Sequence, residues 1–167
     1  MIKKAGFGGG CHWCTEAVFS SLKGVSNVQQ GWITSTGNNS WLSEGVVLEF
    51  DDAIISLDTL IAVHLYTHAS TSLHSMRGKY RSAVYIFDNE DAITAKEIII
   101  KLQPEFDKRI ITQVLPFNRF EKSREELLNY YYSNPQKPFC ENYINPKLKL
   151  IKERFGKVAN NEILVHL

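Results

Sequence analysis

The strongest constraint on the fold is a run of three glycines near the start of the chain, residues 8–10, which is followed by Cys11. Residues 2–7 have the pattern of a short strand, and apolar side chains then recur at helical spacing from Trp13 as far as Gly24. Glycines between two such segments allow the backbone to turn sharply. The sequence therefore predicts a strand, a tight turn and a helix that begins at Cys11.

A cysteine in this position is expected to be reactive. Unpaired backbone N–H groups at the start of a helix stabilise an anion, so the Cys11 thiol should ionise more readily than in water. Cys14 follows one helical turn later, which is the arrangement of a redox pair. Two alternatives remain open. Cys11 and Cys14 together with His64 and His68 are four candidate ligands for a structural zinc ion, or Cys14 and the histidines are inert packing residues.

The rest of the chain alternates between strand and helix patterns. Two strands separated by turn-forming residues form a predicted hairpin, and a helix follows Ser56, which is a good N-cap residue. The remaining predictions are listed in chain order: strands at 26–33, 44–50, 80–87 and 110–115, and helices from Ser56, from Asn89 to about Phe106, and at 124–131.

This order, roughly β-α-β-β-α-β-α-β with a helical tail, combines a hairpin with crossover helices. It predicts an α+β fold of the ferredoxin-like kind, a two-layer sandwich in which helices cover one side of a mixed sheet. Prolines within residues 133–138 break the pattern, so the C-terminal segment is expected to be loop-rich and partly helical. The chain has 167 residues and no repeat or linker, and we expect residues 1–167 to form a single domain.

Charge and cysteine content narrow the range of partners. The formal net charge is +1, which provides no field to attract nucleic acid or an anionic membrane surface. No segment has the apolar length of a signal-peptide core or a membrane span. Three cysteines are too few for a disulfide framework, and thiols persist in a reducing compartment. We therefore expect a cytoplasmic monomer that binds no nucleic acid and no membrane.

Residues elsewhere in the chain are candidates for a site around Cys11. Glu44 begins a strand with an apolar face, and burial there would favour the protonated form that can donate a proton near neutrality. An exposed strand-end carboxylate is the alternative. Trp13, Trp32 and Tyr80 are aromatic residues able to enclose an apolar group of a substrate, although most aromatic residues of a small domain belong to its core.

Motifs distributed along the chain, in a fixed order, point to one family. They are the opening motif at residues 8–14, Gly31-Trp32, Ser43-Glu44, residues 78–82, Asn134-Pro135 and Phe139-Cys140. On these residues the chain resembles the A-type peptide methionine sulfoxide reductases over nearly its whole length. The opening motif, the Tyr-Arg-Ser block and the Asn-Pro…Cys segment, in that order, form a specific combination.

The resemblance implies an activity and a role for each candidate residue. The family reduces the S epimer of methionine sulfoxide, free or in proteins, and takes electrons from thioredoxin or another dithiol reductant, with no bound cofactor or metal. By this resemblance, Cys11 is the nucleophile that becomes a sulfenic acid, and Glu44 is the acid that protonates the sulfoxide oxygen. Trp13 matches an aromatic residue that holds the substrate methyl group, and Tyr80 matches one that helps bind the oxygen.

The chain departs from the family pattern at several positions. His12 stands where phenylalanine is usual in the methyl-binding pair, and Trp32 replaces the usual tyrosine after Gly31. His12 keeps a ring face and adds a titratable group, whereas the Trp32 indole donates one hydrogen bond and accepts none. Ser75 occupies the position of the family's acidic residue five before the residue that matches Tyr80. We expect these departures to alter substrate preference and rate.

Two cysteines are candidates for resolving the sulfenic acid as a disulfide. The family places the resolving cysteine in the C-terminal segment, which matches Cys140, whereas Cys14 lies far closer to Cys11 in the sequence. A disulfide needs Cα atoms within about 7 Å and suitably oriented Cβ atoms, so bridging Cys11 and Cys14 involves local unwinding of the helix. The alternative functions are a thiol-disulfide oxidoreductase that uses Cys11 and Cys14, and a zinc-stabilised interaction module.

Overall fold

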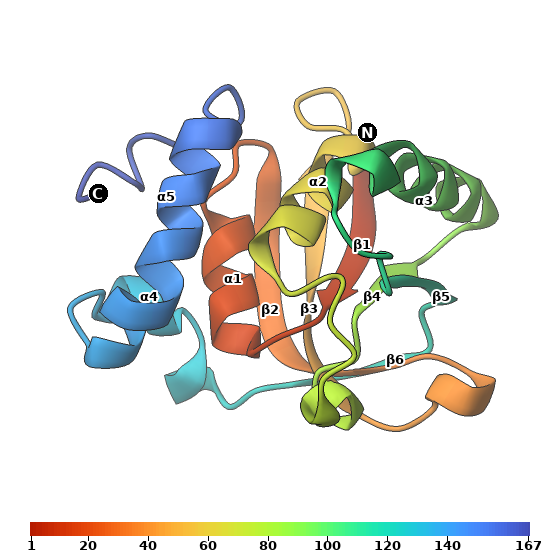
Figure 1. Cartoon of the computed structure of the whole chain (residues 1–167). Coiled ribbons are helices and arrows are strands. Elements are labelled where there is room, and N and C mark those ends of the chain that lie inside the picture. Colours follow the sequence, from red (N-terminus) through yellow and green to blue (C-terminus); the bar gives the residue numbers. More distant parts are fainter.

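A six-stranded mixed sheet forms the centre of the computed structural model, which describes all of residues 1–167 (Figure 1). The strands are β1 (Ile2–Gly8), β2 (Val25–Thr34), β3 (Ser43–Asp51), β4 (Ala83–Ile86), β5 (Gln113–Pro116) and β6 (Arg119–Lys122). The helices are α1 (His12–Ser20), α2 (Leu57–Thr67), α3 (Asn89–Leu102), α4 (Tyr130–Ser133) and α5 (Asn145–Arg154).

The order of strands across the sheet is β5-β4-β1-β3-β2-β6, and only the pair of β4 and β5 is parallel. Its centre is the unit β1-α1-β2-β3-α2-β4, in which the strands lie in the order β4-β1-β3-β2. This is the ferredoxin-like arrangement of two split βαβ units. The predicted α+β fold and the predicted hairpin of β2 and β3 are therefore confirmed.

The main core lies between the sheet and the helices, with α1 and α2 in front of the sheet in the view of Figure 1. Side chains alternate between the two faces of each strand. In β4, Val84 and Ile86 belong to the main core, whereas Ala83 and Tyr85 belong to a smaller apolar cluster on the opposite face. Burial of the larger cluster provides most of the hydrophobic stabilisation and fixes the helix that carries Cys11 against the sheet.

The helix starts follow from local sequence. Ser56 caps α2 by accepting a hydrogen bond from the backbone N–H of Thr59 at 3.1 Å, as the sequence predicts. Asp88 caps α3 in the same way, through the backbone N–H of Asp91 at 2.8 Å. After Leu102 a short 3-10 turn ends at Glu105, close to the predicted helix end.

Two predicted strands are longer than the observed ones. The strand predicted at 80–87 is reduced to β4, because the backbone N–H of Arg81 donates to the Ser43 hydroxyl at 2.8 Å instead of entering the strand ladder. The strand predicted at 110–115 begins only at Gln113 and extends to Pro116. Before it, the backbone N–H of Ile110 donates to a side-chain oxygen, that of Gln103, at 2.9 Å.

The prediction of one continuous helix at 124–131 is wrong. The structure has a 3-10 turn at Glu125–Leu127 and then the short helix α4. Asn129 separates them because its φ of 56° places it in the left-handed region, which a continuous helix cannot include. This conformation is held by Glu16, whose carboxylate accepts the backbone N–H of Asn129 at 2.8 Å.

The edge strand β6 is not evident in the sequence and depends on a distant glycine. It pairs antiparallel with β2, and Gly31 lies opposite Lys122. A Cβ atom at Gly31 would lie 2.1 Å from the carbonyl oxygen of Glu121 and 2.9 Å from the ring of Phe120. The Gly31-Trp32 motif therefore has a structural role, since it allows β6 to pack directly on β2 beside the site.

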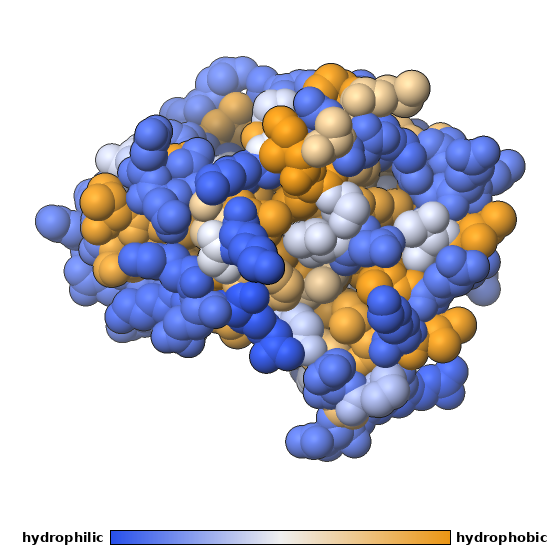
Figure 2. All heavy atoms as spheres, turned by 90° about the horizontal axis from the view of Figure 1, so that it is seen from above, coloured by the Kyte–Doolittle hydropathy of each residue, from blue (hydrophilic) through white to orange (hydrophobic).

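Hydrophobic and hydrophilic residues are mixed on the surface of the protein, as is usual for a folded domain. On the face drawn in Figure 2, hydrophobic residues form separate patches bordered by hydrophilic ones. The large apolar side chains that are exposed come from dispersed places in the sequence, from Met1 to Val165, and such single exposures are normal. No helix of the structure has both the length and the apolar character needed to cross a bilayer.

Candidate active site

Cys11 lies where the chain leaving β1 enters α1, as the glycine run predicts. It is the N-cap residue of α1 and is half-buried. The Cys14 thiol donates a hydrogen bond to its sulfur, as do the backbone N–H groups of Trp13 and Cys14. These donors lower the pKa of the Cys11 thiol below its ordinary value, although burial acts in the opposite direction. The start of α1 thus surrounds Cys11 with hydrogen-bond donors of the kind that favour an ionised thiol.

Two of the glycines before Cys11 are required by close approach. The φ of Gly9 is 154°, a conformation that other residues rarely adopt, and a Cβ atom there would lie 2.4 Å from the His68 ring. A Cβ atom on Gly8 would lie 2.9 Å from the carbonyl oxygen of Glu44. The turn thus brings the backbone before Cys11 into contact with both α2 and β3.

Cys14 is buried beneath Cys11, and the two thiols have opposite tendencies. The hydrogen bond that Cys14 donates to Cys11 raises the pKa of Cys14, and burial raises it further. Within the pair, Cys11 is thus the group that holds the negative charge, and Cys14 is the group that keeps its proton. All three cysteines are free in this structure.

Cys140 lies inside the main core, with no exposed surface. It begins a π-helical segment, Cys140–Ile144, that leads directly into α5. Burial raises the pKa of its thiol. Cys140 lies close enough to Cys14 for its charge to raise the pKa of Cys14, so the three cysteines form one neighbourhood.

Glu44 is buried, with 5% of its surface exposed, so the alternative of an exposed strand-end carboxylate is excluded. One carboxylate oxygen accepts the backbone N–H of His12 at 3.2 Å, which places Glu44 against the start of α1. The other oxygen lies 3.3 Å from the ammonium of Lys79. The backbone N–H of Glu44 donates to the carbonyl oxygen of Lys79 at 3.0 Å. The two residues are therefore joined both through their side chains and through their backbones.

One cavity of about 390 Å³ brings together the residues that the sequence analysis assigned to the site. Its walls contain the nucleophile candidate Cys11 and the acid candidate Glu44. The other lining residues are His12, Trp13, Trp32, Lys79, Tyr80, Leu127 and Phe139. Four separate parts of the chain contribute: the start of α1, the β2–β3 hairpin, the segment before β4, and the region around α4.

Aromatic rings form one wall of this cavity. The indole of Trp13 stacks on the ring of Tyr130, with centroids 4.1 Å apart and an interplanar angle of 8°. The ring of Phe139 meets the Trp13 indole edge-on at 5.7 Å. Contacts of this kind fix the plane of an aromatic side chain. Trp13 is therefore held in one orientation beside the Cys11 sulfur.

His12, which departs from the family pattern, is buried and contacts two elements. Its Nδ1 lies 3.0 Å from the carbonyl oxygen of Gly31, which only accepts, so Nδ1 carries the proton in this contact. The same atom lies 3.6 Å from a carboxylate oxygen of Glu44. The imidazole meets the Trp32 indole edge-on at 5.3 Å. Histidine thus keeps an aromatic face at this position and adds a link to Glu44.

The sequence analysis missed part of the cavity wall. Leu127, which lines the cavity, and Tyr130, which stacks on Trp13, come from the segment that was predicted as one helix, so their placement depends on the break at Asn129. Lys79, which also lines the cavity, was included in the motif at residues 78–82 but was not assigned to the site. Trp41 does not line the cavity, and its Nε1 donates to the carbonyl oxygen of Gly78 at 2.7 Å.

The two histidines proposed as zinc ligands are engaged in other contacts. His64 Nε2 lies 2.8 Å from the carbonyl oxygen of Gly8, and His68 Nε2 lies 2.8 Å from the Ser82 hydroxyl. The rings stack with centroids 4.0 Å apart. Burial lowers the pKa of His64 well below its ordinary value and that of His68 to about 3, so both rings are neutral.

Comparison with known sequences gives a consistent match. A family model described as peptide methionine sulfoxide reductase matches residues 3–159. The peptide methionine sulfoxide reductase MsrA of Pasteurella multocida is 32% identical, with 95% of this chain and 99% of the relative covered. The MsrA of Chromobacterium violaceum is 34% identical, with 96% of this chain and 100% of the relative covered.

Solved structures show the same fold at lower identity. Mxr1 from Saccharomyces cerevisiae in its reduced form superposes with a TM-score of 0.73 at 20% identity, covering 85% of this chain and 91% of that chain. Mxr1 in complex with Trx2 superposes with a TM-score of 0.62 at 18% identity, covering 75% of this chain and 83% of that chain. These likenesses concern the fold.

The sequence matches extend over whole proteins and are not limited to a shared segment. Both relatives exceed 30% identity and are covered almost completely. The motifs that carry the resemblance all lie within the matched residues 3–159. The chain therefore belongs to the peptide methionine sulfoxide reductase family.

Proposed function

We propose that this protein reduces the S epimer of methionine sulfoxide, free or in proteins, to methionine, with Cys11 as the nucleophile. The observation that carries the proposal is the presence, in one cavity, of an easily ionised thiol, a buried carboxylate and an aromatic wall. A sulfoxide sulfur accepts a nucleophile, and its oxygen becomes more basic as the new bond forms. The cavity contains a group for each part of this chemistry.

The first step transfers the oxygen from substrate to enzyme. The Cys11 thiolate attacks the sulfoxide sulfur, and Glu44 gives a proton to the oxygen. The hydroxyl then moves to the Cys11 sulfur as the sulfur–oxygen bond of the substrate and the bond between the two sulfur atoms break, so methionine leaves and Cys11 remains as a sulfenic acid. The substrate gains two electrons and Cys11 loses two. The proton received by the oxygen balances the one that the Cys11 thiol lost, so no other proton source is needed.

The aromatic residues supply substrate binding. The Trp13 indole, held flat by Tyr130, offers a ring face for the substrate methyl group, with the His12 ring beside it. The Tyr80 hydroxyl and the Trp32 indole N–H are donors for the sulfoxide oxygen. An apolar face on one side and donors on the other distinguish methyl from oxygen at the sulfur, which is how one epimer is selected.

The activity is tested with the two epimers of dabsyl-methionine sulfoxide and dithiothreitol as reductant. The S epimer is expected to be converted to the sulfide, and the R epimer is expected to remain. The binding groups lie in fixed positions around the Cys11 sulfur, so only one arrangement of methyl and oxygen fits. Equal conversion of both epimers, or of neither, would contradict the proposal.

The resolving cysteine is proposed to be Cys14. Its thiol already donates to the Cys11 sulfur, so the two sulfur atoms are neighbours before any rearrangement. Cys140 has no exposed surface and is packed in the main core, so it would have to leave the core to reach a sulfenic acid on Cys11. Attack by Cys14 on the Cys11 sulfenic acid forms a disulfide and releases water.

Mass mapping after one turnover without reductant tests this assignment. Trypsin places Cys11 and Cys14 in one peptide, residues 5–23, and Cys140 in another, residues 125–147. We expect the first peptide alone to lose two hydrogens. Cys14→Ser should block this disulfide and leave a Cys11 sulfenic acid that dimedone traps, whereas Cys140→Ser should behave as the wild type. A cross-link between the two peptides would transfer the resolving role to Cys140.

The electron donor is proposed to be thioredoxin or a comparable dithiol. The solved complex of Mxr1 with Trx2 supports this proposal, because the fold of this chain is the same. A dithiol reduces the disulfide by exchange and restores both thiols. The cytoplasmic location and the monomeric state stay predictions from the sequence.

A further inference from the structure

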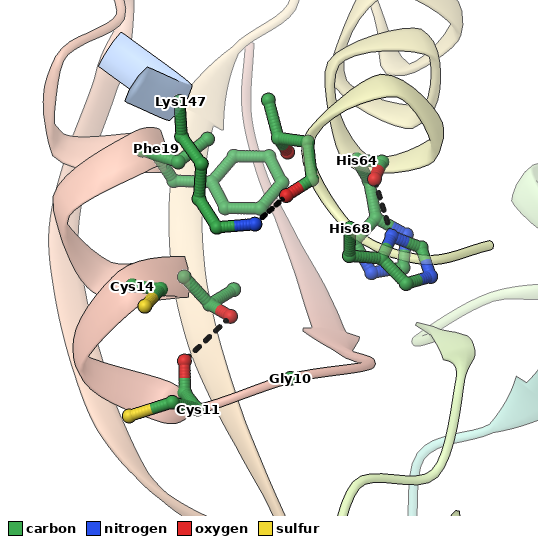
Figure 3. Close-up of a pocket in the computed structure, with 10 residues that line it drawn as sticks. Gly10, Cys11, Cys14, Phe19, His64, His68 and Lys147 are labelled. Carbon is green, nitrogen blue, oxygen red and sulfur yellow. Dashed lines mark hydrogen bonds between the residues drawn. The ribbon is translucent and has the colours of Figure 1, made fainter. Parts of the chain in front are cut away.

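A second, smaller cavity lies behind the cysteine pair. Its volume is about 50 Å³, and Cys11 is the only residue that it shares with the substrate cavity. It lies between α1, the end of α2 and the start of α5 (Figure 3). The lining residues are Gly10, Cys11, Cys14, Thr15, Val18, Phe19, His64, Thr67, His68 and Lys147.

Lys147 is the one cationic side chain among these residues. Figure 3 shows it extending from α5 past Phe19, with its nitrogen directed to the carbonyl at the end of α2 and with Cys11 and Cys14 below it in this view. Its ammonium donates to the backbone carbonyl of Thr67 at the end of α2, which fixes its position. Burial lowers the pKa of Lys147, while Cys14 and Cys11 raise it, so the ammonium lies within electrostatic reach of both sulfur atoms.

The two histidines of this cavity carry no positive charge, unlike Lys147. His64 and His68 are both neutral because burial lowers their pKa values. His64 Nδ1 has no hydrogen-bond partner within the protein. Among the groups that affect Cys14, Cys11 and Cys140 both raise its pKa, and only Lys147 lowers it.

We infer that Lys147 is a positioning residue for the disulfide-forming step, and that its ammonium stabilises the Cys14 thiolate when Cys14 attacks the Cys11 sulfenic acid. This inference rests on the proposed function and on Cys14 as the resolving cysteine. The resting pair keeps the proton on Cys14, whereas the second step needs Cys14 as a thiolate. A cation fixed in the cavity that Cys14 lines reduces that conflict.

The step is balanced without another reactant. The Cys14 thiol loses its proton, and its sulfur forms a bond to the Cys11 sulfur. The bond between the Cys11 sulfur and its hydroxyl breaks, and the hydroxyl takes up one proton and leaves as water. Cys14 is oxidised, and the sulfenic acid sulfur is reduced to the disulfide level. Lys147 is unchanged, because it contributes charge and no electrons.

The test separates the two steps in full-length protein mixed with one equivalent of the S-sulfoxide. Lys147→Met removes the charge and keeps a long apolar side chain, and Lys147→Arg keeps the charge. Lys149→Met, on an exposed part of α5, is the matched control. Methionine release reports the first step. Dimedone trapping and the mass of peptide 5–23 report the sulfenic acid and the disulfide.

In Lys147→Met, disulfide formation should slow more than methionine release, and the pH midpoint of disulfide formation should rise, because Lys147 acts more strongly on Cys14 than on Cys11. Each unit of rise in pKa lowers the thiolate fraction about tenfold and raises nucleophilicity about threefold, so the rate below the midpoint falls about threefold per unit. Lys147→Arg and Lys149→Met should form the disulfide at close to the wild-type rate.

Three results would overturn the inference. Unchanged disulfide formation in Lys147→Met would show that the charge has no role. Equal slowing of methionine release and disulfide formation, without rescue by Lys147→Arg, would show a purely structural role. A wild-type disulfide that includes Cys140 would overturn the Cys14 assignment as well. Failure of the wild type to release methionine would instead refute the proposed function, so the two failures are distinguishable.

Discussion

Replacing Cys11 with serine is expected to abolish sulfoxide reduction, with kcat/KM lower by at least about a thousandfold. The hydrogen bonds from Cys14 and the start of α1 lower the pKa of a thiol, but they cannot ionise an alcohol at neutral pH. A serine hydroxyl in the same place therefore cannot attack the sulfoxide sulfur. The measurement is conversion of dabsyl-methionine-S-sulfoxide with dithiothreitol.

Cys14→Ser is the matched control for this prediction. Serine is nearly the same size and can still donate a hydrogen bond toward the Cys11 sulfur. Because the first step needs no electrons from Cys14, and serine can keep the hydrogen bond to Cys11, this variant should release one methionine per protein in the absence of reductant. Neutral-pH alkylation, which the lowered pKa directs to Cys11, should persist in Cys14→Ser and be lost in Cys11→Ser. Appreciable turnover by Cys11→Ser would exclude Cys11 as the nucleophile.

The central fold was predictable because its signals are local. The strand, glycine turn and helix around Cys11 each depend on neighbouring residues, as does the N-cap at Ser56. The hairpin was predictable from alternation on either side of turn-forming residues. Elements of this kind are specified by periodicity and local conformation, and they form the βαββαβ unit.

The parts that were missed depend on contacts between distant residues. Asn129 breaks the predicted helix because a carboxylate far away in the sequence, that of Glu16, accepts its backbone N–H. The strand β6 has little local signal and forms because Gly31 leaves space for it. Neither partner can be identified from the local sequence, since each pairing is set by the assembled sheet.

The site, like the fold, has a part that local sequence motifs predict and a part that depends on contacts between distant residues. Cys11, Glu44 and Trp13 were found from motifs, and the structure places all three around one cavity. Tyr130, which stacks on Trp13, was missed because its segment was predicted as a helix with a different end. Lys147 was missed because a single lysine in a charged helix carries no signal of burial, and its environment exists only after α5 packs on α1.

Glu44→Gln is expected to lower kcat by about a hundredfold or more, which is the usual effect of removing a general acid. Glutamine has nearly the same shape, and its amide oxygen can still accept the backbone N–H of His12. The start of α1 and the cavity wall should therefore be preserved, and KM should change little. What the amide lacks is a proton that it can give to the sulfoxide oxygen.

Glu49→Gln is the matched control, because Glu49 lies on the same strand, β3, outside the cavity. Glu49→Gln also replaces a carboxylate with a neutral amide, but it does so away from the reacting atoms. Its kcat should be within about twofold of the wild type, as surface changes of this kind have small effects. A Glu44→Gln enzyme with similarly unchanged kcat would show that the proton comes from another group.

The reactivity of Cys11 in the Glu44→Gln variant separates two roles of the carboxylate, which are proton transfer to the substrate and activation of the Cys11 thiol. An ionised Glu44 would raise the pKa of Cys11, and a neutral amide in its place cannot, so Glu44→Gln should leave the pKa of Cys11 unchanged or lower it. Alkylation of Cys11 by iodoacetamide should then be as fast as in the wild type or faster, while sulfoxide reduction is slow. If alkylation slowed in parallel with reduction, Glu44 would be acting on the nucleophile. Opposite changes in the two rates would show that Glu44 acts on the sulfoxide and does not act by activating the thiol, as expected of a group that gives a proton to the substrate oxygen.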